Sequence, residues 1–352
     1  MTRHPLHVTG GVDTHGRTHH AAALDQAGRI LGDREFPATA AGYRQLQAWL
    51  AGFGALDAVG VEGTGTYGAG LARHLAGQHI MVLEVDRPDR KTRRNKGKSD
   101  PIDSIAAARA VQAGTATGVP KSRTGPVEPI RAIRVARRGA MKVRVAALNQ
   151  LHGLVTSAPE SLRADLADMT NRSLIKRAAG FRINEDRLDD PAMATKAALR
   201  AIARRVQNLD AEIAQADRII KPAITTLAPT TMALFGVGPQ VAAQMVVTAG
   251  DNPERLRNDA AFAHPCGTAP LPASSGKTNR HRLNRGGDRQ ANHALHTVVL
   301  NRMRYDPATK RYVERRTKDG LGKKEIMRCL KRYVIREVHA TLIADFTIND
   351  PT

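Results

Sequence analysis

Four acidic side chains near the start of the chain suit metal-ion chemistry: Asp13, Glu62, Asp100 and Asp103. Asp13 and Glu62 each end an apolar, strand-like run, whereas Asp100 and Asp103 are three residues apart and would project from one face of a helix. A pair of divalent cations needs several converging oxygen ligands, which strand ends and a helix start can supply together. The set therefore predicts a nuclease-type site in which all four acids are ligands of two Mg²⁺ ions.

Helix capping is the alternative explanation for the last two of these acids. Asp100 stands before Pro101 with Asp103 three residues on, which matches a capping residue, a first-turn proline and an acidic third position. Asp13 and Glu62 have no such explanation, because an acid at the end of a buried strand is costly unless it is exposed or coordinates something. The following Gly63–Gly68 segment matches no phosphate-binding glycine motif and predicts a tight strand-to-helix turn that opens Glu62 to substrate.

A second group of residues could perform nucleophilic chemistry on phosphate. Ser274 and Ser275 precede Gly276 in a loop rich in glycine and proline, and basic residues follow them: Lys277, Arg280, Arg282 and Arg285. A serine hydroxyl needs a base, a metal or cations to become a nucleophile, and a transferring phosphoryl group needs positive clamps. Serines in such loops are also ordinary turn residues, so both interpretations stay open on the residues alone.

The charge of the chain indicates a polyanionic partner. With 54 Lys and Arg against 33 Asp and Glu in 352 residues, the net charge is +21, which favours nucleic acid through counterion release. One basic run, residues 86–98, is predicted to be a phosphate-contacting loop through Arg90, Lys91, Arg93, Arg94, Lys96 and Lys98. Aromatic residues are only 3%, which favours recognition of the backbone by Arg and Lys over base stacking along a strand.

Other classes of protein are excluded by composition. The two cysteines, Cys266 and Cys329, form no CxxC motif, which argues against a disulfide scaffold or a zinc ribbon. No run of about 18 uncharged apolar residues is present to span a bilayer. The first residues lack the long apolar region of a secretory signal, so we expect a cytoplasmic protein without membrane contact.

The elements that must position the acids follow from hydrophobic periodicity. The first 85 residues predict the order β-β-β-α-β-α-β, with three antiparallel strands before the α/β units, as in the ribonuclease H-like (RuvC-like) fold. The predicted elements are strands at 7–12, 19–24, 29–36, 57–62 and 80–85, and helices at 40–50 and 69–76. A helix at 101–113, preceded by Asp100 and carrying Asp103 in its first turn, completes this α/β domain at residues 1–120.

The rest of the chain is predicted to be mainly helical. Residues 121–228 form a basic helical linker, and apolar residues from Leu199 to Leu227 recur in steps of three and four, as in a coiled coil. We expect homo-oligomerisation through this seam, as a dimer or tetramer, with an intramolecular helical hairpin as the alternative. Residues 229–352 form a compact domain with the serine loop and a helix-hairpin-helix-like segment, in which Gly236 and Gly238 let backbone amides approach phosphate.

Taken together, these motifs resemble the transposases of the insertion-sequence-110 family. The resemblance is carried by GVDTH, VEGTGTYG and KSDPIDSIAAARA, then LFGVGPQVAAQ, then GTAPLPASSGKT with HRLNRGGDRQANHAL, in the order and spacing of that family. It implies a RuvC-like domain whose DEDD tetrad corresponds to Asp13, Glu62, Asp100 and Asp103. It also implies a C-terminal transposase domain with a serine nucleophile. The family's Ser-Gly pair aligns with Ser275 and Gly276, so Ser275 is preferred over Ser274.

The resemblance further implies the reaction and its partners. The expected protein is a Mg²⁺-dependent recombinase that mobilises an insertion sequence through a covalent phosphoserine–DNA intermediate. A non-coding bridge RNA would guide it to double-stranded donor and target DNA. Two alternatives remain: a RuvC-type Holliday-junction resolvase or nuclease that hydrolyses DNA without a covalent intermediate, and a non-catalytic nucleic-acid-binding protein.

Overall fold

The computed structural model describes residues 6–85, 99–252, 255–274, 281–282, 284 and 286–349. The chain divides into two compact units. The first comprises residues 1–125 together with 249–257, and the second comprises residues 126–248 and 258–352. The domain boundaries expected after residues 120 and 228 stay a prediction, because the second unit contains both the helical linker and most of the C-terminal region.

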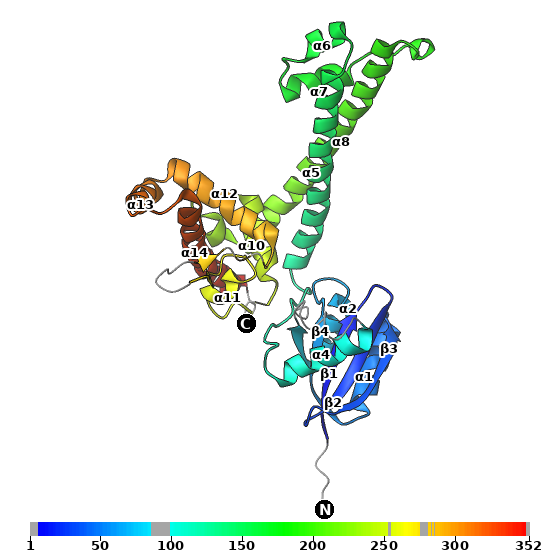
Figure 1. The fold of residues 1–352 in the computed structure, drawn as a ribbon, viewed down its shortest axis with the longest axis vertical. Helices are drawn as coiled ribbons and strands as arrows, with labels where there is room; N and C mark the ends of the chain where they lie inside the picture. Colours follow the sequence, from blue (N-terminus) through cyan, green and yellow to red (C-terminus); the bar gives the residue numbers. More distant parts are fainter. Residues whose placement is uncertain are drawn as a thin grey trace, which may run out of the picture. The chain divides into compact units, whose positions relative to one another are not determined.

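The first unit is built on a five-stranded mixed sheet with the order β3-β2-β1-β4-β5 (Figure 1). Strands β1, β2 and β3 are antiparallel neighbours, whereas β4 and β5 run parallel to β1. This arrangement confirms the predicted ribonuclease H-like fold. The elements are β1 (His7–Thr14), β2 (Thr18–Asp25), β3 (Ile30–Pro37), α1 (Ala40–Ala51), β4 (Ala55–Glu62), α2 (Ala69–Gly77), β5 (Met81–Val85) and α4 (Asp100–Gln112).

One face of the sheet carries the main hydrophobic core of this unit. Leu46 and Leu50 of α1 and Leu71 and Leu75 of α2 are fully buried and pack with inward-facing strand residues such as Val59. These leucines recur every four residues along each helix, which places them on one face. The sequence periodicity thereby fixes which face of each helix covers the sheet.

The opposite face of the sheet receives α4 at very close range, because two strand residues are glycines. A Cβ atom built on Gly11 of β1 would lie 2.1 Å from the carbonyl oxygen of Ser104 and 2.3 Å from the amide nitrogen of Ala108. A Cβ built on Gly60 of β4 would lie 2.8 Å from the carbonyl oxygen of Ala107. Only glycine leaves room for the helix backbone at this distance.

A return of the chain completes the first unit. Within this return, Asn252 and Arg255 form hydrogen bonds to backbone groups of residues 119–122. The Asn252 side chain donates to the Pro120 carbonyl (2.9 Å) and accepts from the Ser122 amide (3.1 Å). Arg255 donates from Nε to the Val119 carbonyl and from Nη1 to the Ala249 carbonyl, at 2.5 and 2.7 Å. A segment from the second half of the sequence is therefore a structural part of the N-terminal unit.

The second unit begins with two long helices that run side by side (Figure 1). They are α5 (Val127–Thr156) and α8 (Pro191–Leu227), and between them lie α6 (Glu160–Leu166), α7 (Asn171–Ala179) and the 3₁₀ turn η1 (Glu185–Arg187). Leucines such as Leu151 and Leu174 are buried where α5, α6, α7 and the first half of α8 share a core. The outside of the hairpin carries polar and basic residues together with exposed valines of α5, such as Val135 and Val143.

The predicted coiled-coil seam is part of this hairpin. Its buried residues are Leu199, Ala203, Val206, Leu209, Ala216, Ile220, Ile224 and Leu227. These residues pack within the chain, against α5 along the length of the hairpin and against α7 near the end where the chain turns back. The seam therefore belongs to an intramolecular helical hairpin. The expectation that it contacts a second copy of the chain is corrected. Three expected seam positions also differ: Ile202 and Ile213 are half-buried, and Ala223 is exposed. Periodicity identifies a buried stripe, but it does not say which helix covers it.

The remainder of the second unit is a helical bundle with a short hairpin. Its elements are α9 (Pro229–Met232), α10 (Pro239–Ala249), α11 (Asp259–Ala263), β6 (Leu271–Pro272), β7 (His281–Arg282), α12 (Arg289–Tyr305), α13 (Pro307–Lys318) and α14 (Lys323–Asn349). Buried Asp345 accepts from the Thr230 and Thr231 amides and so caps α9 from a distant helix. Among the described residues, none of the helices combines the length and the apolar run that a bilayer span requires.

Candidate metal and nucleic-acid sites

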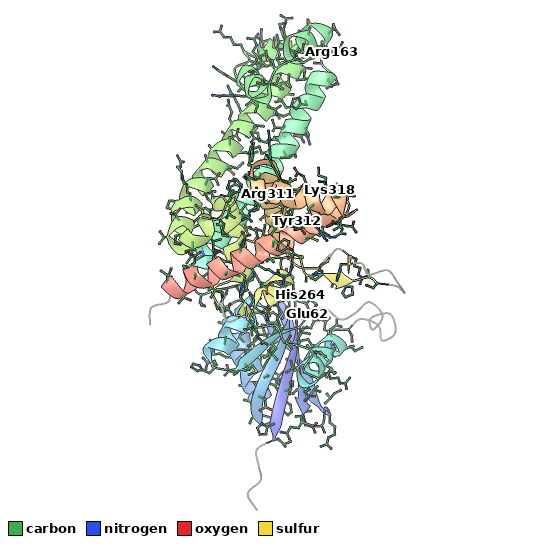
Figure 2. The ribbon with its side chains drawn as sticks, turned by 90° about the vertical axis from the view of Figure 1, so that its left-hand side faces the viewer. Glu62, Arg163, His264, Arg311, Tyr312 and Lys318 are labelled. Atoms are coloured by element: carbon green, nitrogen blue, oxygen red, sulfur yellow. The ribbon has the colours of Figure 1, made fainter. Side chains whose placement is uncertain are left out.

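The parallel pairing of β1 with β4 brings two of the four predicted acids to one edge of the sheet. Val12 pairs with Val61, so the next residues along the two strands, Asp13 and Glu62, occupy neighbouring positions on the same face. That face is the one covered by α4, because the glycines two residues earlier on each strand contact the helix. Both carboxylates are nearly inaccessible, at 5% and 8% exposure. Figure 2 labels Glu62 at the end of its strand.

A histidine joins the acids and was not predicted as a site residue. One ligand atom each from Asp13, His15 and Asp100 lies within 4.8 Å of the others. The His15 Nε2 atom is 3.2 Å from Asp13 Oδ2 and 3.3 Å from Asp100 Oδ1. Among the described residues, neither Asp13 Oδ2 nor His15 Nε2 has a partner in hydrogen-bond geometry, although both atoms are buried. The sequence signal that could have identified His15 is its position two residues after Asp13, in the turn that follows β1.

The electrostatics of Asp13 reflect burial beside other acids. Burial raises the pKa of the Asp13 carboxyl above its ordinary value, and His15 lowers it. The charges of Asp103 and Asp100 raise this pKa further. A buried carboxylate surrounded by like charges is unfavourable unless a cation compensates it. Asp13, Asp100 and Asp103 therefore form one electrostatic group, although Asp103 is not a member of the 4.8 Å cluster.

The start of α4 bears on the capping interpretation of Asp100. The N-cap position is held by Ser99, with no side-chain capping bond, and the helix begins at Asp100 with Pro101 in its first turn. Asp100 is therefore not the capping residue, and its side chain is 41% exposed beside His15. Asp103 is buried on the side of α4 that meets the sheet. The assignment of Asp100 and Asp103 as metal ligands stays a prediction.

The segment after Glu62 is a tight turn, as the sequence predicts. Gly63 has φ +69°, a conformation that favours glycine, and the Gly68 amide donates to the Gly63 carbonyl at 3.1 Å. Thr64 is buried and donates its hydroxyl to Glu84 of the neighbouring strand. Arg123 donates from Nη2 to the Gly65 carbonyl at 2.6 Å. The loop beside Glu62 is therefore held on both sides by side chains of its own unit.

The predicted serine loop lies between two short strands that sequence reasoning missed. Strand β6 pairs with β7 in an antiparallel hairpin, and exposed Ser274 follows β6. Arg282 is exposed on β7. The predicted nucleophile Ser275 and the predicted phosphate contacts Lys277, Arg280 and Arg285 lie outside the described residues, as do Arg90, Lys91, Arg93, Arg94, Lys96 and Lys98 of the basic run. Two-residue strands give too short a pattern to recognise in a sequence.

The glycines of the helix-hairpin-helix-like segment form a turn between α9 and α10. Gly236 has φ +81°, and the Val237 amide donates to the Leu234 carbonyl at 3.0 Å. Around Gly238 nothing lies within 4 Å of the position that a Cβ would occupy, so the backbone there is open on that side. The turn therefore has the shape that would let a phosphate approach the start of α10.

Comparison with protein-family models gives two matches. Residues 10–158 match the transposase model DEDD_Tnp_IS110, which spans the sheet, α4 and α5. Residues 229–314 match the model of the transposase IS116/IS110/IS902 family, which spans the Gly236 turn, the β6–β7 hairpin and α12. A search of the curated proteins found no match. The two matched segments contain all the residues predicted from the sequence to carry chemistry.

Proposed function

The chain belongs to the IS110 family of transposases, and from this membership we propose that it is a Mg²⁺-dependent DNA recombinase acting through a phosphoserine–DNA intermediate. Family membership supports DNA transposase and recombinase activity as such. The observation that best supports the finer proposal is the Asp13–His15–Asp100 cluster at the end of β1.

The residues of this cluster fit a hard divalent cation. Asp13 Oδ2 is buried and lacks a hydrogen-bond partner among the described residues, which is the state of a carboxylate oxygen that needs a cation. Carboxylate oxygens are the ligands that Mg²⁺ prefers. We assign the ligand set to Asp13, Glu62, Asp100 and Asp103, with two ions. When bound, Mg²⁺ would polarise the scissile phosphate and favour deprotonation of the attacking hydroxyl.

His15 has a different role from the acids in this proposal. Imidazole suits softer cations than Mg²⁺, so His15 is not assigned as a ligand. Its Nε2 atom is 3.2 Å from Asp13 Oδ2 and 3.3 Å from Asp100 Oδ1, so the ring lies beside both carboxylates. We infer that His15 holds Asp13 and Asp100 in position and so acts as a positioning residue.

The covalent step is assigned to Ser275. Its Oγ atom would attack the scissile phosphorus in line, and a DNA hydroxyl would leave with the serine proton restored to it. A hydroxyl of a second DNA end then attacks the phosphoserine, releases the serine and completes strand exchange. No ATP is required, because the phosphodiester is exchanged rather than hydrolysed. Arg280, Arg282 and Arg285 are assigned as phosphate clamps on this loop.

The partners in this proposal are double-stranded donor and target DNA and a non-coding guide RNA. The net charge of +21 supports several polyanionic ligands. A cytoplasmic, nucleoid-associated location follows from action on chromosomal DNA. Homo-oligomerisation as a dimer or tetramer is also proposed, but through the outer face of α5. Val135 and Val143 are 47% and 48% exposed there, while the α8 seam is buried within the chain.

A trapping experiment tests the covalent step. Wild-type protein is incubated with a labelled element-end duplex and Mg²⁺, then denatured, and protein–DNA adducts are resolved by gel electrophoresis. We expect an adduct that disappears in Ser275→Ala and persists in Ser274→Ala, its matched neighbour. Cleavage without any adduct would instead favour a hydrolytic resolvase, and binding without cleavage would favour a non-catalytic protein. An adduct lost only in Ser274→Ala would move the nucleophile by one residue.

A further inference from the structure

The second unit contains a pocket of about 640 Å³ with a strongly basic lining. Its walls come from β7, α13, α14 and the segment after α11. Seven arginine and lysine side chains line it, against a single acid, Glu325. A concave site of this size has the volume of a small-molecule or nucleotide pocket. Its charge requires an anionic occupant.

Several of these cations lack an acid that would neutralise them. Arg332 and Arg336 share Asp259, the first at 2.7 Å and the second at 3.3 Å. Within the described part of the chain, Arg315 and Lys331 form no ion pair. Lys331 donates to the Asn292 side chain at 2.7 Å, and burial lowers its pKa, which is the effect expected for a poorly solvated ammonium group.

A buried donor of the pocket also lacks an acceptor. Arg316 pairs through Nη1 with Asp319 at 3.1 Å, but its buried Nε has no hydrogen-bond partner among the described residues. An unpaired buried guanidinium N–H costs free energy until an acceptor is supplied. A phosphate oxygen is a suitable acceptor for such a donor.

Two of the five tyrosines of the chain stand in the same pocket. The Tyr312 and Tyr333 rings meet edge to face with centroids 5.5 Å apart, and Arg336 lies 5.8 Å over the Tyr333 ring. Tyr333 is 46% exposed, and burial raises the pKa of Tyr312 to about 12, so its phenol remains a hydrogen-bond donor at neutral pH. Aromatic rings beside arginines are the surfaces on which unpaired bases stack. Helix α13 is seen in Figure 2, where Arg311 and Tyr312 are labelled.

We propose that this pocket binds one unpaired nucleotide of a DNA strand, with its phosphate on the basic wall and its base against Tyr333. A duplex is too wide to enter a pocket of about 640 Å³, so a basic site for duplex DNA would be a groove or an open face. The choice of DNA over RNA rests on the proposed function. Strand β7 lines the pocket and follows Ser275 by six residues in the sequence, so the occupant is assigned to the strand that is cleaved.

Binding of single-stranded and duplex DNA by the full-length protein tests this proposal. Fluorescence anisotropy is measured in EDTA with labelled oligothymidylate of about 20 nucleotides and with the matching duplex. The pocket variants are Tyr333→Ala and Arg315→Gln. Tyr305→Ala is the control for the tyrosine, because Tyr305 is also exposed (58%) with an arginine over its ring. Arg311→Gln is the control for the arginine, because Arg311 is exposed one turn earlier on α13 and outside the pocket lining.

We expect Tyr333→Ala to weaken binding of the single strand by about 10-fold and to leave duplex affinity within about 2-fold. Arg315→Gln should weaken binding of the single strand and reduce the magnitude of the slope of log affinity against log salt by about 0.7. Both controls should bind both DNAs like the wild type. The proposal would be overturned if the pocket variants bound single-stranded DNA as tightly as their controls. It would also be overturned if they lost duplex affinity to the same extent as single-strand affinity.

Two further measurements distinguish a wrong choice of nucleic acid from a wrong assignment of the pocket. Oligouridylate of the same length is measured in parallel, and loss of oligouridylate binding alone would reassign the pocket to RNA and overturn the choice of DNA. Because EDTA removes cleavage from the assay, the result is independent of the metal and serine assignments. Unchanged binding in the pocket variants together with a normal phosphoserine adduct would reject the pocket while leaving the proposed reaction intact.

Discussion

Substituting Gly11 by alanine should separate α4 from the sheet. The added Cβ would lie 2.1 Å from the Ser104 carbonyl oxygen and 2.3 Å from the Ala108 amide nitrogen. Carbon atoms contact such groups at about 3.5 Å, so α4 must move by about 1 Å or more, because both contacted atoms are backbone. Overpacking against rigid backbone costs more stability than overpacking against side chains. We therefore expect Gly11→Ala to lower the free energy of unfolding by about 3 kcal/mol.

Hydrogen exchange measured by mass spectrometry gives a local readout of this cost. A loss of about 3 kcal/mol corresponds to amide exchange about 100-fold faster in the α4 segment. Residues of α8 serve as an internal reference, because they belong to the second unit. We also expect Gly11→Ala to lose Mg²⁺-dependent cleavage, since Asp100 and Asp103 are carried by the displaced helix.

Gly10→Ala is the matched control for this substitution. Its Cβ would point to the other face, 2.9 Å from the end of the flexible Leu50 side chain, which can turn away at a cost of about 1 kcal/mol. If α4 exchanged at the wild-type rate in Gly11→Ala, the close helix–sheet contact and the argument that it positions the acids would both be wrong.

Three other predictions concern the acids, the hairpin and assembly. Because burial raises the pKa of Asp13, the metal-free folded protein binds this proton more tightly than the unfolded chain and loses stability as the pH rises through the raised value. Asp13→Asn should therefore raise the melting temperature in EDTA at neutral pH, whereas Mg²⁺ should stabilise only the wild type in the same thermal scan. Leu199→Ala, at a fully buried seam position, should cost about 3 kcal/mol of the stability of the helical hairpin, measured as faster amide exchange in α5 and α8; wild-type exchange would show that the seam does not pack as described. The double variant Val135→Glu and Val143→Glu should reduce the mass found by light scattering without unfolding the chain, and an unchanged mass would exclude the outer face of α5 as the contact.

The N-terminal fold was predictable because its signals are local. Asp13 and Glu62 stand at or next to the ends of continuous apolar strands, and the turn at Gly28, with φ +78°, is a short glycine-containing loop between two strands. The four acids were identified in the same way, since Asp13 and Glu62 lie at or next to strand ends and Asp100 and Asp103 lie in the first turn of a helix. The strand order β3-β2-β1-β4-β5 could not be read from the sequence, because the pairing of strands is not a local signal.

The features that were missed depend on contacts between distant segments. His15 joins the acid cluster because a turn brings its ring back between Asp13 and Asp100. The α8 seam is covered by α5, although the periodic pattern of α8 is equally compatible with a second copy. The pocket joins residues of the C-terminal motifs, such as Gly267 and Arg282, to residues of α13 and α14 that lie outside any motif. Such features are encoded in the packing of the whole chain and not in any local spacing.

The return of residues 249–257 to the first unit has a consequence for modularity. The polypeptide crosses between the two units at three places, after residues 125, 248 and 257, where a single tether would allow only one crossing. The unit that carries the acids cannot be excised intact by one cut, because the Pro120 and Val119 carbonyls would lose the side chains of Asn252 and Arg255. Recombination of genes therefore cannot exchange one unit for a homologous unit by a single crossover without breaking this arrangement. The two units are expected to be inherited together, as one evolutionary module.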